Sequence, residues 1–341
     1  MMFQIRRILV VLLAAGLVGW SGVAAAETTT LRVGLHISPE HIVAKKGVEP
    51  WMAKVAEVAG DRVTLKYFPA EQAAKANAML DALRDGIIDI GLVPTAYFGD
   101  RLPLNSVIAL PGFFSDAKSG TAAFEDFMKE GPLRDEFLGL DLVPLMPIVV
   151  PPYQVLSKDK RLGAQSDWAN LDIRTSGSTQ ALTARALGGT SVSVAGPEVY
   201  AAVERGRVDA VLFPIASVPT FNLQEVVSYV SDNGSFGGFS FILAGRKSVI
   251  DALPEDIRKA MVDAGWRISS DLAAANDDLT GELLNQWKAK GINVYSFTPE
   301  ELKEVNAALG PVKTDWEARV EKQNPKAAEV LKMMEAKASG R

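Results

Sequence analysis

Apolar residues follow a regular order of strand-like and helix-like spacing in the first third of the chain. Alternating apolar positions predict strands over 31–35 and 63–67, and helical spacing predicts helices over 51–58 and 79–83. A short apolar strand follows the second helix. This order of strand, helix, strand, helix and strand is typical of a mostly parallel sheet with helices on both faces.

One pattern of residues occurs twice in the chain. ALRDGIIDIGLVP at 82–94 and AVERGRVDAVLFP at 202–214 both place a helix end, a glycine, an aspartate, a strand and a proline in that order. Gly206 is suited to end its helix with a left-handed residue, and Pro214 to end its strand. A single match would fit any helix–strand connection. Two matches predict two similar α/β lobes.

A third pattern predicts an unusually long helix. From Pro254 to Gly291 there is no interior proline, and apolar residues recur at helical spacing. Roughly 37 residues at about 1.5 Å each would give a helix about 55 Å long, which could lie along both lobes. The alternative is two ordinary helices with a break near 276–278.

Two short segments have the composition expected where the chain crosses between lobes. These are Pro151-Pro152, and Gly237-Gly238 just before a strand in which Phe239 and Phe241 alternate with polar or small residues. We expect a mixed, mostly parallel sheet in each lobe. The chain is expected to divide into a signal peptide, two lobes of two segments each and a C-terminal helix or tail, namely 1–26, 27–151 with 240–278, 152–239 with 279–318, and 319–341.

The N-terminus has the three parts of a secretory signal peptide. Arg6 and Arg7 precede an apolar stretch over 8–18, and small residues at 24–26 offer a cleavage site before Glu27. The apolar stretch is shorter than the roughly 20 residues that a spanning helix needs. We therefore expect an exported soluble protein, with an uncleaved anchor as the alternative.

Composition narrows the function classes. The chain has 36 Lys and Arg against 41 Asp and Glu, and without Arg6 and Arg7 the balance is 34 against 41, a net charge of −7. An acidic chain without a basic block is a poor candidate for nucleic-acid binding. The absence of cysteine excludes disulfides, thiolate nucleophiles and cysteine metal sites. A mature chain of about 315 residues is long enough for two domains.

The sequence offers little support for catalysis. The two histidines, His36 and His41, are five residues apart, which does not place them on one helical face. The GxSxG, P-loop, HExxH and GxGxxG patterns are absent. We expect no enzymatic activity, no metal and no cofactor. The alternative is a secreted hydrolase that uses His36 or His41 with Asp89.

Arg174 has the most specific functional interpretation. In LDIRTSGS it stands near the C-terminal end of a predicted strand, ahead of small residues at 176–178. Ligands bind at this edge of open α/β sheets, and a guanidinium there can hold a carboxylate through two parallel hydrogen bonds. On position alone, a structural ion pair with an acidic side chain is an equally good explanation.

These residues belong to a longer resemblance. LDIRTSGS followed by LGGTSVSVAGPEVYAAVERGRVDA resembles the signature of dicarboxylate-receptor-type solute-binding proteins of TRAP (tripartite ATP-independent periplasmic) transporters. VTLKYFPAEQ, MLDALRDGIIDIG, IALPGFF and ALPEDIRKAM fall in the family's order, so the likeness covers essentially the whole mature chain. The resemblance implies two α/β lobes that close by a hinge on a small organic acid and deliver it to an ion-driven membrane permease.

Further expectations follow from this resemblance. It implies that Arg174 holds the ligand carboxylate and that the protein works in the periplasm. We expect a monomer without nucleic-acid partners. A binding protein that serves an ABC importer or a sensor kinase is the alternative, because its polypeptide could look much the same.

The sequence departs from the family pattern around the expected pocket. Gln154 stands where a second arginine is common, and Phe213 and Pro94 stand where polar residues are common. The expected pocket therefore has few polar groups and flat apolar walls. The side chains predicted to contact the ligand are Arg174, Gln154, Phe213, Tyr97, Pro94, Tyr153, Phe239 and His36.

This pocket favours a monocarboxylate with an apolar or aromatic body, including a 2-oxo or 2-hydroxy acid that uses Gln154. A dicarboxylate would leave its second charge unpaired, and an uncompensated buried charge costs several kcal/mol.

Overall fold

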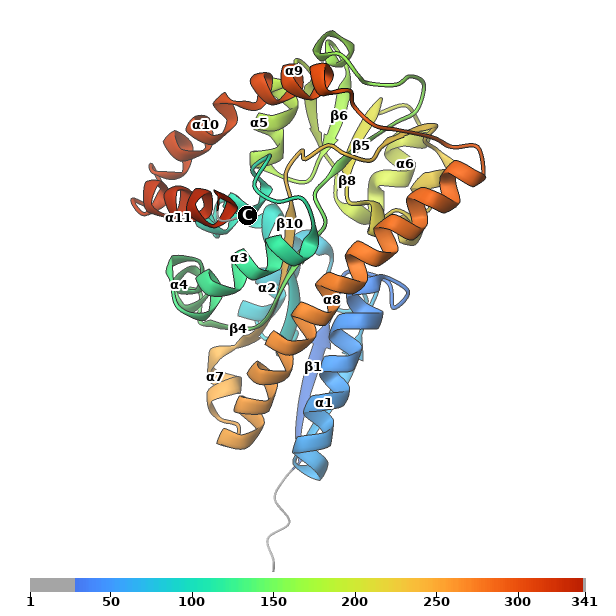
Figure 1. Ribbon diagram of the computed structural model, residues 1–341. Coiled ribbons are helices and arrows are strands. Elements are labelled where there is room, and N and C mark those ends of the chain that lie inside the picture. Colours follow the sequence, from blue (N-terminus) through green and yellow to red (C-terminus); the bar gives the residue numbers. More distant parts are fainter. Residues whose placement is uncertain (1–27, 340–341) are drawn as a thin grey trace, which may run out of the picture.

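The computed structural model describes residues 28–339, so the predicted signal peptide at 1–26 lies outside the described residues. Two mixed sheets with helices packed against them form two lobes, and the elements of one lobe lie below those of the other in Figure 1. The α/β fold with a mixed sheet in each lobe is thus confirmed.

The first lobe contains a sheet in the order β2-β1-β3-β10-β4. β1 is parallel to β2 and β3, whereas β10 is antiparallel to β3 and β4. Two prolines are tolerated in β4 because this strand lies at the sheet edge. The strands are β1 Thr29–Gly34, β2 Val63–Phe68, β3 Ile90–Pro94, β4 Leu142–Val150 and β10 Phe239–Arg246.

The second lobe contains a sheet in the order β11-β9-β5-β8-β6-β7. β6 is parallel to β7 and β8, and β5 is antiparallel to β8 and β9. The strands are β5 Gln154–Ser157, β6 Asp172–Thr175, β7 Thr190–Ser193, β8 Ala210–Phe213, β9 Tyr229–Ser231 and β11 Asn293–Tyr295.

Short helices connect the strands of both lobes. Those of the first lobe are α1 Glu49–Ala59, α2 Met79–Arg84, α3 Ala117–Lys129, α4 Pro132–Leu138 and α7 Lys247–Asp251. Those of the second lobe are α5 Ser178–Ala186 and α6 Val199–Glu204.

The repeated sequence pattern corresponds to equivalent structure in the two lobes. Gly86 and Gly206 have φ angles of 71° and 67°, so each ends a helix in the left-handed conformation. Asp89 then accepts a hydrogen bond from the backbone N–H of Arg32, at 2.9 Å, and Asp209 accepts one from that of Asp172, at 2.8 Å. Each aspartate thereby ties the start of its strand to the neighbouring parallel strand, which confirms the predicted likeness of the lobes.

The predicted long helix is a single element, α8, Glu255–Ala289, of 35 residues, with no break near 276–278. It runs diagonally along both lobes in Figure 1. Its first half buries Ile257 and Met261 in the core of the first lobe, and its second half buries Leu283 and Trp287 among the apolar side chains of the second. α8 therefore couples the two lobes mechanically.

Gly265 explains how α8 can lie so close to the first sheet. A β-carbon at this position would stand 1.9 Å from the carbonyl oxygen of Leu145, which lies at an irregularity in the pairing of β4 with β10. Ser269, one turn along the helix, donates a hydrogen bond to the carbonyl of Pro147. The helix thus packs directly against the backbone of β4.

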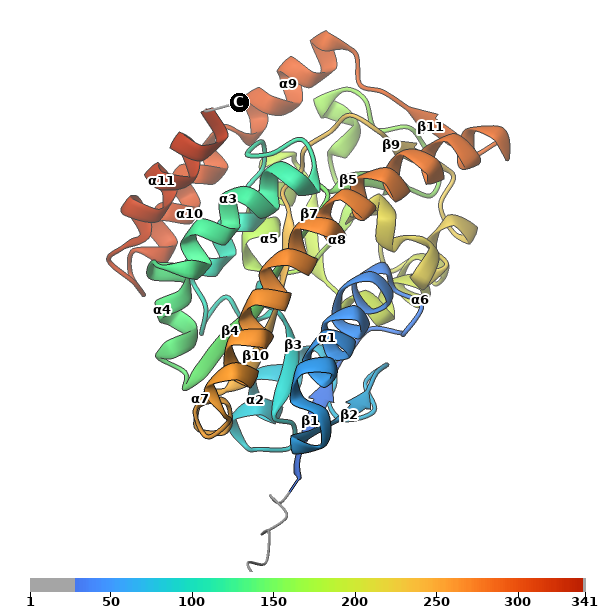
Figure 2. The same cartoon turned by 60° about the horizontal axis from the view of Figure 1, so that its bottom comes forward.

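The chain also returns along the other side of the molecule. The C-terminal helices are α9 Pro299–Leu309, α10 Pro311–Val320 and α11 Ala327–Ser339. α9 contacts α5 of the second lobe, whereas α11 contacts α3 of the first and buries Val330 and Met334. Figure 2 shows α10 and α11 beside α3 and α4. Together these three helices therefore bridge the two lobes.

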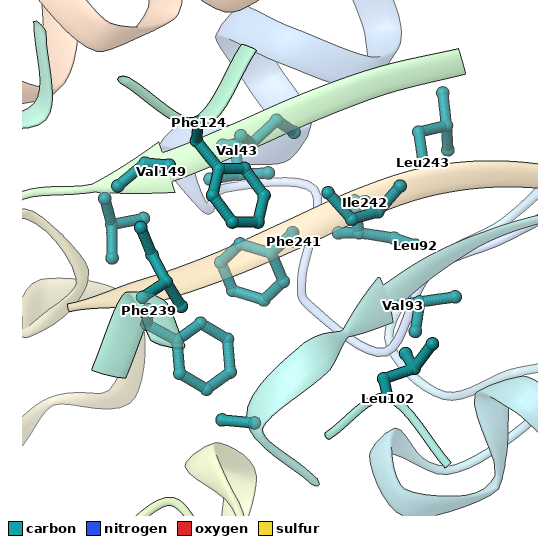
Figure 3. Close-up of a cluster of buried hydrophobic side chains, with 14 of the residues drawn as sticks. Val43, Leu92, Val93, Leu102, Phe124, Val149, Phe239, Phe241, Ile242 and Leu243 are labelled. Carbon is teal, nitrogen blue, oxygen red and sulfur yellow. The ribbon is translucent and has the colours of Figure 1, made fainter. Parts of the chain in front are cut away.

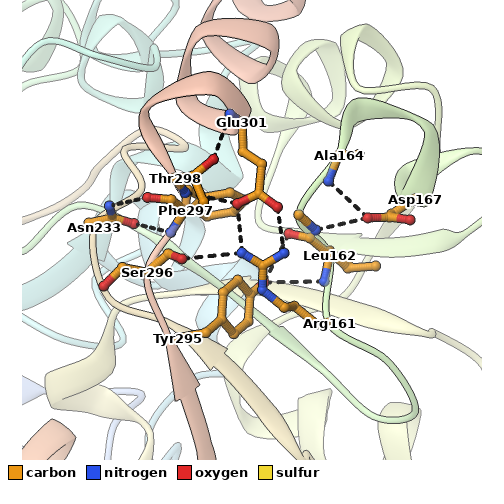
Figure 4. Close-up of polar contacts among 11 residues, drawn as sticks. Arg161, Leu162, Ala164, Asp167, Asn233, Tyr295, Ser296, Phe297, Thr298 and Glu301 are labelled. Atoms are coloured by element: carbon orange, nitrogen blue, oxygen red, sulfur yellow. Dashed lines mark hydrogen bonds and ion pairs between the residues drawn. The ribbon is translucent and has the colours of Figure 1, made fainter.

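The start of α9 is fixed by a capping box, in which two residues satisfy each other's backbone N–H groups. Thr298 accepts from the N–H of Glu301, and Glu301 accepts from the N–H of Thr298. Glu301 also forms a two-pronged ion pair with Arg161, at 2.5 and 2.6 Å, as Figure 4 shows. This pair attaches α9 to the loop after β5.

The chain crosses between the sheets near the two predicted places. Pro151-Pro152 separates β4 of the first sheet from β5 of the second, and Gly237-Gly238 precedes β10, which returns to the first. Gly237 has a φ of 106°, and a β-carbon there would lie 2.2 Å from the carbonyl oxygen of Ala109. The exact boundaries of the lobes stay a prediction.

Candidate ligand-binding site

A narrow cavity lies between the two lobes, walled mainly by aromatic rings. Its aromatic residues are Tyr97, Tyr153, Phe213, Phe221, Phe239 and Phe241, and its side chains with other polar atoms are His36, His41, Arg174 and Ser217. The cavity volume is about 30 Å³, which is room for one or two water molecules. A ligand with a ring must therefore part the lobes or turn aromatic side chains to enter.

Arg174 lies on β6, the middle strand of the parallel group β7-β6-β8, and is only 1% exposed. Its Nε donates to the carbonyl of Val194 at 2.9 Å, and its Nη1 donates to that of Leu212 at 3.0 Å. These two carbonyls fix the plane of the guanidinium. Among the described residues no carboxylate forms an ion pair with it, so its charge is held by neutral dipoles beside the cavity.

Aromatic rings surround this guanidinium. Its carbon lies 5.1 Å from the centroid of Phe213, a cation–π distance. The pKa of the Tyr153 hydroxyl is raised, chiefly by burial, whereas the neighbouring side chains of Arg174 and Ser176 act in the opposite direction. Tyr153 therefore stays neutral, with its hydroxyl next to the arginine.

The opposite wall comes from β10. Phe239 and Phe241 are two residues apart and so project from the same face of the strand, with their centroids 4.8 Å apart. Figure 3 shows the two rings side by side on this strand. Phe239 stacks on Tyr153, at 6.2 Å and 14°, so the aromatic surface is continuous from β10 to the start of β5.

His41 connects the lobes at the cavity wall. Its Nδ1 accepts from the N–H of Val43 at 3.1 Å, and its Nε2 lies 3.0 Å from Oγ of Ser217, which follows β8 in the second lobe. The proton of the neutral ring is therefore on Nε2, which donates to Ser217. Burial, with repulsion from His36, lowers the pKa of His41 to about 3.

A second hydrogen bond crosses between the lobes on another side of the cavity. The N–H of Gly196, in the second lobe, donates to the Tyr97 hydroxyl at 2.9 Å. Tyr97 also lines a separate polar space of about 420 Å³ that includes Lys75 and Ser178. Tyr97 therefore stands between this outer space and the inner cavity.

Most of the side chains predicted for the site meet at this cavity. Those that line it are Arg174, Phe213, Tyr97, Tyr153, Phe239 and His36. They come from both lobes and from segments far apart in the sequence. That they contact a ligand stays a prediction.

Gln154, which was predicted to contact the ligand, does not lie on the cavity wall. Its Nε2 donates to the carbonyl of Gly234 at 2.7 Å, and its Oε1 accepts from Ser231 Oγ at 2.8 Å and from the N–H of Gly234 at 2.9 Å. Consecutive residues of an extended chain point to opposite sides, so Tyr153 reaches the cavity and Gln154 does not. Gln154 instead anchors the segment before β10.

Pro94 is also absent from the cavity wall. It pairs with Phe241 in the sheet and precedes the short 3-10 turn Thr95–Phe98, which carries Tyr97. Its effect on the cavity is therefore indirect, through the position of this turn.

Sequence reasoning missed several residues of the cavity. Phe241 could have been found, because it follows Phe239 with the period of a strand. Phe221 and Ser217 lie in short turns after β8, where no periodic pattern indicates the direction in which a side chain points. They line the cavity because of the path that this segment takes in the folded protein.

The acidic partner of the hydrolase alternative lies elsewhere. Asp89 accepts from Nε and Nη2 of Arg32, both at 2.9 Å, at the N-terminal end of β3. His36 and His41 lie beyond the C-terminal end of β1, which is the other edge of the same parallel pair. The three side chains do not form a catalytic group. Among the described residues, no group of histidines and carboxylates could hold a metal ion either.

Comparison with known proteins identifies the family. The model of the family described as "Bacterial extracellular solute-binding protein, family 7" (DctP) matches residues 35–319. The chain belongs to this family. DctP proteins are the solute-binding components of TRAP transporters and not enzymes, so the hydrolase alternative is wrong.

Among the described helices, none is both long and apolar enough to cross a membrane.

Individual solute-binding proteins are similar to this chain over most of their length. A "Solute-binding protein" of Albidiferax ferrireducens is 25% identical over 270 residues, covering 75% of this chain and 78% of the relative. A TRAP solute-binding protein of Rhodoferax ferrireducens T118, solved with copurified benzoate, is 24% identical with a TM-score of 0.84, covering 92% and 98% of the two chains.

A third relative comes from a marine metagenome. This TRAP solute-binding protein, specific for aromatic acids and solved with 3-hydroxybenzoate, is 19% identical with a TM-score of 0.85. The match covers 92% of this chain and 98% of that one. At this identity the likeness establishes the fold.

Proposed function

We propose that the protein is the periplasmic receptor of a TRAP transporter and that it binds a monocarboxylate with an aromatic body between its lobes. One observation carries the proposal: a buried guanidinium, without a carboxylate partner among the described residues, lies at the edge of an aromatic cavity. Its two carbonyl contacts orient Arg174 without neutralising it. A ligand carboxylate would supply the missing negative charge.

The charge count of the cavity supports a single acid group. No lysine and no second arginine are among the residues that line it. Both histidines are held neutral by burial, which lowers the pKa of His36 to about 4 and that of His41 to about 3. A second ligand carboxylate would be buried without a cation, at a cost of several kcal/mol.

The shape of the walls supports an aromatic body. Tyr153 and Phe239 are stacked with 14° between their planes, and Phe213 lies 6.3 Å from Tyr153. Flat rings favour a flat ligand, because offset stacking and edge-to-face contacts add to the burial of apolar area. Benzoate and 3-hydroxybenzoate, found with two relatives of the same fold, are ligands of this shape.

Closure of the lobes on the ligand is the conformational change that prepares the receptor for delivery to the membrane permease. The two hydrogen bonds across the cavity, from His41 to Ser217 and from Gly196 to Tyr97, join residues of different lobes. A ligand that touches both lobes favours the closed state by its differential affinity for it. The closed receptor then delivers the acid to the membrane permease. A cleaved signal peptide and a monomeric receptor belong to the same proposal.

Thermal-shift measurements on the mature protein test this function. At 100 times its Kd, a ligand stabilises a protein by about 2.7 kcal/mol, which raises the Tm of a large domain by several degrees. We expect such a rise with benzoate or 3-hydroxybenzoate and none with succinate or with benzamide, which keeps the ring but lacks the charge. Stabilisation by succinate alone would overturn the proposed ligand class.

A further inference from the structure

His36 lines the cavity and has a polar atom without a hydrogen-bond partner. The side chain is 4% exposed and lines the cavity just beyond β1. Its Nδ1 is buried and has no hydrogen-bond partner among the described residues. It is the one such atom among the residues that line this cavity. Buried polar atoms are normally paired, so this atom indicates a missing partner.

His41 differs from His36 in this respect. Both ring nitrogens of His41 are used, one by the backbone of Val43 and one by Ser217. It therefore has no free nitrogen for a ligand, and its contribution is to hold the lobes together. The two histidines therefore differ in role: His41 forms a hydrogen bond between the lobes, whereas His36 has a nitrogen that is free to pair with a ligand.

The protonation state of His36 decides whether its Nδ1 can pair with a hydrogen-bond donor or with an acceptor. Burial lowers the pKa of the ring to about 4, so the ring is neutral near pH 7 and carries one proton. A backbone hydrogen bond to Leu92 raises the pKa against this effect, as a carbonyl does when it accepts from a ring N–H. Since Nδ1 has no partner, we assign the interaction with Leu92 to Nε2, which leaves Nδ1 as the hydrogen-bond acceptor.

His36 and Arg174 lie at opposite ends of the aromatic wall. His36 packs on Phe241 at 5.6 Å, Phe241 packs on Phe239, and Phe239 stacks on Tyr153, whose hydroxyl neighbours Arg174. His36 belongs to the first lobe and Arg174 to the second. A ligand held by both would have its carboxylate at one end and a hydrogen-bond donor at the other.

We propose that His36 is a specificity-determining residue, whose Nδ1 accepts a hydrogen bond from a hydroxyl on the ring of the ligand, away from the carboxylate. This inference rests on the proposed function and narrows its ligand class to hydroxylated aromatic monoacids. It also replaces the 2-hydroxy or 2-oxo acid expected from the sequence, because Gln154, which was to hold that group, lies outside the cavity.

The expected preference follows from the burial of the acceptor. Closing the lobes over a ring without a hydroxyl leaves Nδ1 dry and unpaired, whereas a hydroxyl pairs it. The difference corresponds to a preference of about 5- to 150-fold for the hydroxylated acid. Because the contact joins the ligand to the first lobe, it is made only when the lobes close.

Calorimetric titration of the wild-type protein tests the preference without any variant. The probes are 3- and 4-hydroxybenzoate, the matching 3- and 4-fluorobenzoates, which are similar in size but lack the donor, and mandelate, whose hydroxyl is next to the carboxylate. We expect at least one hydroxybenzoate to bind about fivefold or more tightly than its fluoro analogue and than mandelate. Equal affinities for each hydroxy and fluoro pair would mean that water satisfies Nδ1, and would overturn the inference.

Two variants assign the preference to His36. In His36→Phe the ratio between the hydroxy and fluoro acids should fall to near one, and in His36→Gln, which offers a carbonyl acceptor, part of it should return. The matched control, His41→Phe, should weaken both acids by the same factor and keep the ratio. A ratio unchanged in His36→Phe would refute the role of this side chain.

The outcomes also separate the two proposals. Tight binding of benzoate and its fluoro analogues without preference for a hydroxyl would refute the role of His36 and leave the receptor function intact. Failure of every aromatic acid to bind would refute both.

Discussion

Replacing Arg174 by alanine is the most direct test of the binding site. The side chain is 1% exposed and spans from β6 to the carbonyls of Val194 and Leu212. Its removal would leave a bound carboxylate buried without a cation. Breaking a buried charge pair from one side costs about 3–5 kcal/mol, so the Kd should rise by about two to four orders of magnitude.

The same substitution has a separate cost in folding. The carbonyls of Val194 and Leu212 lose their donors, and each unsatisfied buried group costs about 1–3 kcal/mol. A domain with a typical stability of about 5–15 kcal/mol should remain folded. Arg174→Lys should lose less affinity than Arg174→Ala, because it keeps the charge but not the planar fork of donors.

Arg161→Ala is a suitable matched control. Arg161 lies in the same lobe, pairs with Glu301 at 2.5 Å and stands 4.6 Å from the ring of Tyr295, but it does not line the cavity. Its loss should lower the free energy of unfolding and leave ligand affinity unchanged. Comparing the two variants therefore separates loss of an arginine in general from loss of the carboxylate partner.

The assay is calorimetric titration of each variant with the acid that stabilises the wild-type protein most, after circular dichroism has shown that the variant is folded. A change of less than about threefold in Kd for folded Arg174→Ala would refute the reasoning, because removing the partner of a buried charge should cost far more binding free energy than that. An equal loss in Arg161→Ala would refute it as well.

Two further predictions concern the stability of the fold. Gly265→Ala would place a β-carbon 1.9 Å from the carbonyl oxygen of Leu145 and should lower the free energy of unfolding by about 3 kcal/mol or more, whereas Gly281→Ala, with nothing within 4 Å, should raise it by about 0.5–1 kcal/mol. Urea unfolding measures both, and equal effects would contradict the close packing of α8. Burial lowers the pKa values of His36 and His41 to about 4 and about 3, below the unfolded value of 6.5, so the contribution of the neutral rings is complete above pH 6.5 and is lost as the pH falls from 6.5 towards 4. Unfolding at pH 7.5, 6 and 5 should show this loss, and a His36→Gln/His41→Gln variant with the same slope would disprove its origin.

The candidate site could be predicted in part because some of its signals are local. Arg174 was expected from a strand followed by small residues, and Tyr153 and Phe239 adjoin the expected lobe crossings. Phe213 was expected because it stands where the resembling family commonly has a polar residue. The direction in which a side chain points was harder to predict than the part of the chain that lies near the site. Of the adjacent pair Tyr153 and Gln154, one reaches the cavity and the other binds the segment at Gly234.

The sequence by itself determined the elements and their order. Strand alternation, helical spacing and the repeated glycine–aspartate pattern depend on residues a few positions apart, and each of these predictions was confirmed. The uninterrupted length of α8 could be predicted only with an alternative left open. A helix is continued or broken by its packing, and here the approach of Gly265 to β4 supplies contacts that no local rule contains.

Only the tertiary structure decided which side chains meet at the cavity and what each can do there. His36 and His41 look alike in the sequence, yet one has a partner in the other lobe and one has a nitrogen left unpaired. That difference arises because Ser217, which is 176 residues from His41, is brought to it by the crossing of the chain between lobes. Hydrogen bonding over such separations is fixed by the packing of whole lobes and not by any short stretch of sequence.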